Sequence, residues 1–416
     1  MFLLFTQHFP SARSAVLELA AQNKPTLQSI LAVSSQHADM VAGRKPTRAF
    51  VHLSKVLPEI QNALTSLEIN EGHIAAVYCL TRLYFARRER TTARSHLHGL
   101  YLMLESYQNA RAENSSPASS SSGSDTPRLP RNPSPLMMFL WRIAIQMDLA
   151  CGQRGQDLVF PPTAQNQEDF HRLWISRIAS PESTEWALAE FALDDLHHHT
   201  LHLEKLSIQL RSSPSYDPIR DEEQLTQGVA NLLAMHEHWK TREIVRQAAR
   251  VENLYRQQYP TTDDTPTFLH YGPPLWFTNE YFARMLLYHT ERIIQIDIIR
   301  SPNLDCPSEQ RVRAAVELCR IIAGVRDMLA GKGGGIGQYF QALNNAGIVF
   351  DPRTYPDGIP LTLMANGEFE WVVGKLVEID RMTGYDSGQT LVDILRETWA
   401  AENTWETYRR LSGQSK

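Results

Sequence analysis

The sequence predicts an all-α protein: a multi-helix bundle of about a dozen helices with one disordered Ser/Pro-rich insertion. Two observations predict this fold class. Apolar residues recur at the i, i+3, i+4, i+7 spacing of amphipathic helices through most of the 416 residues. The sequence has no alternating series typical of strands, and the only strand-like run is residues 347–350. No repeat of fixed period is found.

Three or four hairpin-linked helices are predicted within residues 12–110. Segments 26–41 and 48–67 each carry an apolar stripe. Asn70 is the predicted N-cap of the next helix, and Thr91 or Thr92 of the one after it, because short polar side chains accept hydrogen bonds from free helix amides.

Residues 111–135 form the predicted insertion. Eight serines and five prolines in 25 positions leave almost nothing to bury, so disorder is expected. Ser116, Thr126 and Ser134 each precede a proline. These dipeptides are either neutral features of a loop or proline-directed phosphorylation sites.

Further helices are predicted from residue 136 onward. Pro181 occupies the first position of one of them, where proline is favoured, and a Pro/Asp/Ser patch at 212–218 ends that helix. A charged helix over 221–259 is followed by a proline-rich loop at 260–274. The predicted helices of this part are 136–151, 182–210, 221–259, 274–299, 307–329, 336–346, 368–383 and 389–411.

Composition excludes several classes of protein. Hydrophobic residues make up 43% and charged residues 21%, which excludes collagen, a wholly disordered chain and a simple coiled coil. The net charge of −5 argues against a protein that coats DNA non-specifically. Four cysteines exclude a disulfide scaffold and suit a reducing compartment. Neither an export signal nor a membrane-spanning segment is expected, which leaves cytosol or nucleus.

Most catalytic motifs fail on spacing. The glycine run at 331–337 fits neither a phosphate loop nor a dinucleotide loop, and a flexible turn between helices explains it. The run from His236 has Lys240 where a zinc-protease helix needs its second histidine. In the run 384–388 the serine stands one place too late for a nucleophile elbow. Cys79, Cys151, Cys306 and Cys319 are too scattered for a zinc or redox site and are predicted core residues.

A histidine-rich helix is the best metal candidate. His198 and His202 are spaced i, i+4, and Asp194 or Asp195 lies one turn back, so the pair could share a metal ion. No third protein ligand is evident, because His197 and His199 point in other directions on a helix. A solvated histidine face that scavenges metal weakly is the preferred interpretation, and we predict no metal, cofactor or catalytic residue.

A basic stretch holds five arginines within thirteen residues, interleaved with Tyr84 and Phe85. Such a pattern is compatible with a nucleic-acid patch. A solvated helix end is the preferred interpretation, since cations near a helix C-terminus complement the helix dipole. The arginines are Arg82, Arg87, Arg88, Arg90 and Arg94.

Four segments together resemble the regulatory (middle homology) domain of fungus-specific transcription factors, the family of the two-zinc, six-cysteine cluster. They are residues 27–38, 91–104, 135–150 and 366–400. The resemblance implies one regulatory domain made of N-terminal helices at 1–110, the linker at 111–135 and the remaining helices at 136–416. Its signature residues, expected to act in packing, are His96, Gly99, Trp141, Arg142, Asp148, Trp371 and Trp399.

Physical chemistry gives these residues structural roles. Gly99 inside a helix costs up to about 1 kcal/mol against alanine, so a close helix crossing is expected there. Arg142 and Asp148 stay buried only if they are paired. The tryptophans at 141, 371 and 399 are predicted core anchors.

The number and spacing of the cysteines differ from those of the family. Members of the family usually carry a six-cysteine cluster that enters the DNA major groove, and four scattered cysteines cannot form one. Either an upstream exon is missing from this chain or the chain is a domain-only relative. Direct DNA binding is therefore not expected.

Three hypotheses follow. The first is a nuclear, non-enzymatic regulator that modulates transcription through a small-molecule effector or through other transcription regulators or the transcription machinery. The second is a helical small-molecule-binding protein or enzyme that reuses the fold, with the histidine-rich helix or His270, Tyr271 and Trp276 as its candidate site. The third is an interaction partner that dimerises with a cluster-bearing relative.

Overall fold

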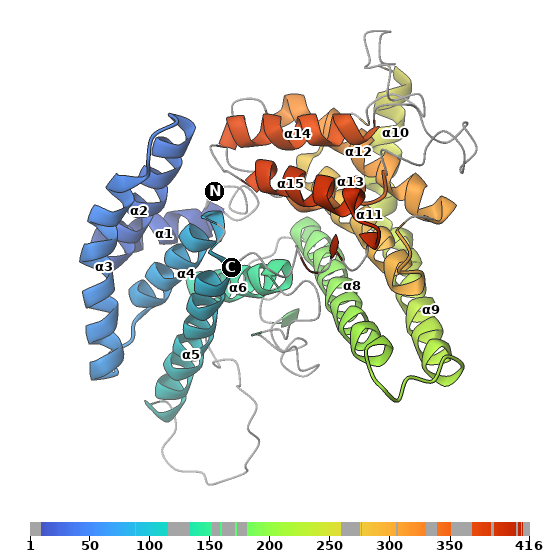
Figure 1. The fold of residues 1–416 in the computed structure, drawn as a ribbon. Helices are drawn as coiled ribbons and strands as arrows, with labels where there is room; N and C mark the ends of the chain where they lie inside the picture. The colour runs from blue at the N-terminus through green and yellow to red at the C-terminus, as the bar shows by residue number, and fades with distance from the viewer. Residues whose placement is uncertain are drawn as a thin grey trace. The chain divides into compact units, whose positions relative to one another are not determined.

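The fold was analysed in a computed structural model, and it is all-α (Figure 1). The structure describes residues 10–87, 89–114, 134–151, 159, 171–172, 181–258, 275, 277–304, 307–329, 339–350, 368–383, 387–404, 407–408 and 410. Within these ranges there are fourteen helices and no strand, which confirms the predicted fold class. None of the described helices is long and apolar enough to cross a bilayer.

The chain divides into two compact units, and the division falls inside one helix, between Ala187 and Leu188. Unit 1 contains the helices before that point and unit 2 those after it. The six helices wholly in unit 1 are α1 (Pro10–Gln22), α2 (Lys24–Val41), α3 (Thr47–Ser66), α4 (Glu71–Ala86), α5 (Arg90–Asn114) and α6 (Pro135–Cys151).

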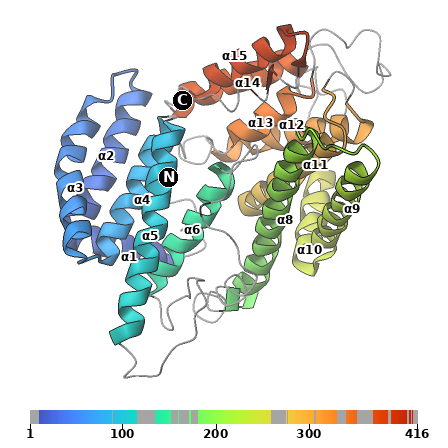
Figure 2. The same ribbon diagram turned by 60° about the horizontal axis from the view of Figure 1, so that its bottom comes forward.

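Unit 1 is built around α2 and α4. Helix α2 packs against α3 and α4, and α4 packs against α5 (Figure 2). Asn23 caps α2 by accepting a hydrogen bond from the Thr26 amide at 3.0 Å. The Thr26 hydroxyl then donates to the Gly72 carbonyl at 2.9 Å, which joins the starts of α2 and α4. A Cβ at Gly72 would lie 2.2 Å from the Asn23 side chain, so only glycine allows this approach.

Several boundaries in unit 1 match the prediction and others correct it. Asn70 caps α4 as predicted, since its Oδ1 accepts from the His73 amide at 3.1 Å. The caps predicted at Thr91 and Thr92 are wrong, because α5 already begins at Arg90. Helix α1 was not predicted, and α5 extends to Asn114, four residues into the expected insertion. Ser116 and Thr126 lie outside the described residues.

Ser134 lies at the N-terminus of α6 and ties it to α4. Its Oγ accepts from the Met137 amide at 3.2 Å and donates to Glu71 Oε1 at 2.8 Å. Glu71 also accepts from the Tyr107 hydroxyl of α5 at 3.0 Å. The Ser134-Pro135 dipeptide is thus an N-cap followed by proline at the first helical position.

Replacement of this cap should destabilise unit 1. We expect Ser134→Ala to lower the free energy of unfolding by about 1 kcal/mol, because both an N-cap and a hydrogen bond to a carboxylate are lost. Urea denaturation followed by circular dichroism measures the change. Ser95→Ala is the matched control, since the Ser95 hydroxyl is exposed and bonds only within α5. Equal stability of both variants and the wild type would contradict the capping role.

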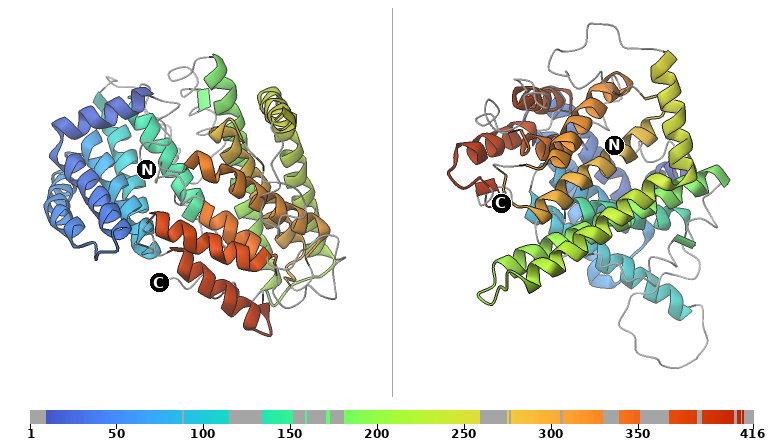
Figure 3. Two further views of the ribbon diagram at one scale, coloured as in Figure 1. Left: turned by 90° about the horizontal axis from the view of Figure 1, so that it is seen from above. Right: turned by 90° about the vertical axis from the view of Figure 1, so that its right-hand side faces the viewer.

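Unit 2 contains most of α8 and the remaining helices (Figure 3). In Figure 3, α14 and α15 lie side by side, and α13 packs against both. The helices are α8 (Pro181–Arg211), α9 (Arg220–Thr241), α10 (Glu243–Gln258), α11 (Glu280–Arg300), α12 (Glu309–Leu329), α13 (Tyr339–Gly347), α14 (Glu368–Thr383) and α15 (Ser387–Ala400).

Unit 2 corrects three predictions. The single helix expected over 221–259 is two helices, separated at Arg242, where φ is −59° and ψ is 134°. Neither glycine nor proline marks this break. Helix α11 begins at Glu280 after the N-cap Asn279, six residues later than predicted. The strand-like run 347–350 is the end of α13 and a buried turn.

Candidate functional site

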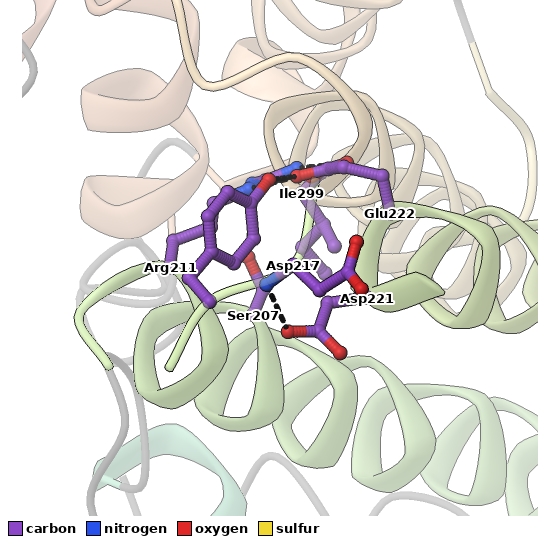
Figure 4. Close-up of polar contacts among 7 residues, drawn as sticks. Ser207, Arg211, Asp217, Asp221, Glu222 and Ile299 are labelled. Atoms are coloured by element: carbon purple, nitrogen blue, oxygen red, sulfur yellow. Dashed lines mark hydrogen bonds and ion pairs between the residues drawn. The ribbon is translucent and has the colours of Figure 1, made fainter. Parts of the chain in front are cut away.

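The turn between α8 and α9 is held by charged side chains (Figure 4). Arg211 donates to both carboxylate oxygens of Glu222, at 2.8 and 2.9 Å, and to the Ile299 carbonyl of α11 at 2.9 Å. Tyr216 donates to the same carboxylate at 2.6 Å. Asp221 accepts from the Asp217 amide at 2.9 Å. This bidentate network fixes α8, α9 and the end of α11 relative to each other within unit 2.

A buried ion pair joins α11 to α12. Arg311 Nε lies 2.7 Å from Asp297 Oδ2, and the two side chains are only 1% and 4% exposed. The same guanidinium donates to the carbonyls of Asp297, Ser301 and Asn303. Arg311 therefore donates to carbonyls at and just after the C-terminus of α11, where a helix leaves carbonyls without intrahelical donors.

Helices α9 to α12 enclose a pocket of about 780 Å³. This volume lies within the range of about 300–1,000 Å³ typical of small-molecule sites. Described residues of all four helices and Leu275 line it. They are Trp239, Lys240, Val245, Arg246, Ala249, Arg250, Glu252, Asn253, Arg256, Leu275, Phe282, Leu286, Val312, Arg313, Val316, Glu317 and Arg320.

One wall of the pocket rests on a stack of three rings. Trp239 lies against His289 with 4.2 Å between ring centroids, and His289 lies against His236 at 3.5 Å. All three side chains are 1% exposed. The Trp239 indole donates to the Ala189 carbonyl of α8 at 2.9 Å. Burial lowers the pKa of His236 to about 3 and that of His289 to about 2, so both rings are neutral at pH 7.

Charged side chains also line the pocket. Burial raises the pKa of Glu317, while Lys240, Arg320 and Arg256 act in the opposite direction and favour its carboxylate. Burial lowers the pKa of Arg256, and the neighbouring Arg320 guanidinium lowers it further, against the carboxylates of Glu252 and Glu317. Three cationic side chains thus surround Glu317.

Glu252 is the second carboxylate of the pocket, and it already has strong partners. It is 1% exposed and accepts hydrogen bonds from the Thr278 amide, the Thr278 hydroxyl and the Asn279 amide, at 2.9 to 3.0 Å. These donors lie at the start of α11, where a helix favours an anion. Glu252 therefore positions α11 against α10.

The signature residues of α5 lie in unit 1. His96 stacks on Tyr84 of α4 with 4.8 Å between ring centroids, and burial lowers its pKa. The close crossing expected at Gly99 is absent from the described structure, because no described atom lies within 4 Å of the position of a Cβ. The contact between α4 and α5 is made by His96 and its apolar neighbours instead.

The signature residues of α6 are buried to different extents. Arg142 and Asp148 are 5% and 2% exposed, and Trp141 is half-buried. Arg142 lies near His171: burial lowers the pKa of this histidine to about 4, and the arginine adds to the shift.

Only one of the three tryptophans predicted as core anchors is fully buried. Trp399 is 2% exposed, and its indole donates to the Gly347 carbonyl at 3.1 Å. Trp141 and Trp371 are half-buried, and the Lys375 ammonium covers the Trp371 ring at 5.6 Å. Trp239, which was not predicted as a core anchor, is buried in unit 2 as deeply as Trp399.

The histidine-rich helix forms the expected solvated face only in part: His199 and His202 are exposed, whereas His197 and His198 are half-buried. Burial lowers the pKa of His197 strongly and that of His198 to about 4. His199 is exposed, and its Nδ1 lies 2.7 Å from the Asp195 carbonyl. In the part of the chain that the structure describes, no group of three His, Cys, Asp or Glu side chains is arranged to hold a metal ion.

The basic stretch is not a uniform solvated surface either. Arg87 is half-buried, forms an ion pair with Glu89 at 2.9 Å and lies over the Phe50 ring at 4.8 Å. Cys79 and Cys319 are buried free thiols, as predicted, and burial raises the pKa of Cys79 to about 12. Other candidates lie outside the described residues: Arg88, Cys306, His270, Tyr271, Trp276 and the run 331–337.

Sequence reasoning missed the pocket. Its residues come from four helices and span positions 239 to 320, so no local motif joins them. One signal was present: α10 has three arginines, all of which line the pocket, next to an apolar stripe. That pattern indicates a basic helix face, but it does not show which other helices pack around that face to form a pocket.

One comparison with known proteins gives a match. Residues 2–199 match the family described as fungal specific transcription factor domain. No curated protein and no solved structure matches the chain. The matched region covers α1 to α6 and part of α8, and the pocket lies beyond it.

Proposed function

From the premise that residues 2–199 of this chain carry a fungal specific transcription factor domain, we propose that the protein is a transcription regulator that works in the nucleus without turnover. Residues 1–110, 111–135 and 136–416 form the segments of its regulatory domain. It modulates transcription through an effector and through other transcription regulators or the transcription machinery.

The family match is the observation that carries this proposal. The pocket of unit 2 supports the effector part, because its volume suits a small molecule and both apolar and charged side chains line it.

A tethered reporter tests the proposal. The chain is fused to a DNA-binding domain from an unrelated protein, and a reporter with the matching operator is measured. We expect a severalfold change in reporter output, and a fluorescent fusion of the chain should concentrate in the nucleus. Unchanged reporter output together with a cytosolic fusion would contradict the proposal and favour a small-molecule-binding protein or enzyme.

A further inference from the structure

We infer that Ser134 is a phosphorylation site for a proline-directed protein kinase, and that the phosphate group releases α6 from α4. The inference does not rest on the proposed function, because the expected change in unit 1 is the same whatever process the chain serves. Three observations carry it: the place of Ser134 in the chain, the contacts of its hydroxyl group and the carboxylate beside that group.

Ser134 lies where a kinase can reach it. The residue is half-buried and comes directly before Pro135, the first residue of α6. As an N-cap it lies outside the helical backbone, and helix ends fray more readily than helix centres. Pro135 supplies the proline that a proline-directed kinase requires after the serine. Proline has no amide hydrogen, so no helix bond of Pro135 has to break when the two residues bind to a kinase.

The hydroxyl group of Ser134 joins two helices. It donates to Glu71 Oε1 at the start of α4 over 2.8 Å, and it accepts from the Met137 amide of α6 at 3.2 Å. Glu71 also accepts from the Tyr107 hydroxyl of α5 at 3.0 Å. Three helices of unit 1 therefore meet at the carboxylate to which Ser134 donates.

Ser134 differs from the other described serines that precede a proline. Ser213 bonds to Ser215 within the turn between α8 and α9. Ser301 is the C-cap of α11, and it acts there through its backbone amide. Among these three serines, only Ser134 connects two helices through its hydroxyl group, so a phosphate there has the largest effect on helix packing.

The transfer step removes the hydrogen atom that holds α6 to α4. The Ser134 Oγ attacks the γ-phosphorus of ATP, the bond from that phosphorus to the β,γ-bridging oxygen breaks, and ADP leaves. The hydroxyl proton passes to a base of the kinase, so phosphoserine has no hydrogen to donate to Glu71. The added phosphate group also cannot fit within the 2.8 Å that separates the two oxygens.

Charge adds to the loss of this hydrogen bond. A phosphoserine carries about −1.5 to −2 charges at pH 7 and is unfavourable next to a carboxylate such as that of Glu71. The N-terminus of a helix favours a phosphate, so α6 should remain helical while its contact with α4 opens. Opening exposes the first turn of α6, where Leu136, Met137 and Met138 are only 1 to 4% exposed.

Hydrogen exchange on the purified full chain tests the inference, before and after treatment with ATP and a cyclin-dependent or a mitogen-activated protein kinase. Trypsin should release residues 132–142, in which Ser134 is the only hydroxyl-bearing residue, so mass spectrometry assigns the phosphate. We expect the amides in the first turns of α6 to exchange about tenfold faster after phosphorylation, because a hydrogen bond to a charged group is lost. Exchange in α9 of unit 2 should not change.

Two variants make the test specific. Ser134→Ala is the matched control, because the kinase can modify only other sites of this variant, and treatment should not change exchange in α6. Glu71→Gln keeps an acceptor for Ser134 but removes the charge and offers the phosphate an amide donor. Phosphorylation of Glu71→Gln should therefore accelerate exchange in α6 much less than in the wild type.

The comparison of the wild type with and without phosphate decides the outcome if a variant fails to fold. Phosphoserine placed at position 134 during translation provides the modified chain independently of the kinase. The inference would be overturned if neither kinase modifies the peptide 132–142 or if exchange in α6 is unchanged in the phosphorylated wild type. It would also be overturned if kinase treatment accelerates this exchange equally in Ser134→Ala or in Glu71→Gln.

Discussion

Replacement of Arg311 by methionine is expected to lower the free energy of unfolding of unit 2 by about 3–5 kcal/mol, because it leaves the Asp297 carboxylate buried without its partner. Arg311 is 1% exposed and bonds to Asp297 and to three backbone carbonyls at the end of α11. The Ser301 and Asn303 carbonyls lose this donor as well. Urea denaturation, followed by the fluorescence of the buried Trp239 and Trp399, measures the loss.

Two further variants make this test specific. Arg313→Met, two residues along α12, removes an exposed arginine paired with Glu309 and should change stability by less than about 0.5 kcal/mol. The double variant Arg311→Met with Asp297→Leu should recover much of the loss, because a buried ion pair is often replaceable by apolar side chains. A loss of less than about 1 kcal/mol in Arg311→Met would contradict the assigned role of the pair.

Acid is expected to destabilise unit 2 through His236 and His289. Their pKa values in the folded chain are about 3 and about 2, against 6.5 for an unperturbed histidine. As pH falls below about 6.5, the two histidines bind protons in the unfolded chain but not in the folded chain. Their contribution to the free energy of unfolding is therefore complete above that pH and declines toward pH 3. Each histidine contributes a slope of up to about 1.4 kcal/mol per pH unit.

The groups around the stack support this direction. Burial dominates both shifts, Lys240 lowers both pKa values, and Glu237 only partly opposes the effect on His289. Urea midpoints between pH 7 and pH 4 should therefore fall less steeply in the double variant His236→Phe, His289→Phe than in the wild type. His238→Gln is the control, since His238 is exposed on the same helix. Parallel curves for the wild type and the double variant would contradict neutral, buried histidines.

Local signals in the sequence predicted much of the fold. Two predicted helix starts are confirmed. Asn70 caps α4, and Pro181 is the first residue of α8. The break between α9 and α10 could not be predicted in this way, because no glycine or proline stands near Arg242. The positions on either side, Trp239 and Val245, are both buried, so tertiary packing redirects the chain there.

The candidate site could not be predicted from local sequence patterns, for a related reason. Helical periodicity shows that a residue lies on an apolar face, but not how deeply neighbouring helices cover that face. Trp371 and Trp399 therefore had the same predicted role, yet only Trp399 is fully buried. The pocket is harder still to predict, since Arg256 and Arg320 are 64 positions apart (320 − 256 = 64) and line the same pocket only in the folded chain.

Rapid depletion of the protein in the cells that express it tests the role in transcription most directly. An inducible degradation tag removes the protein, and nascent transcripts are sequenced before secondary effects accumulate. We expect an immediate change in the synthesis of a defined set of transcripts, reversed when untagged protein is restored. Unchanged nascent transcription after complete depletion would contradict the assignment as a transcription regulator.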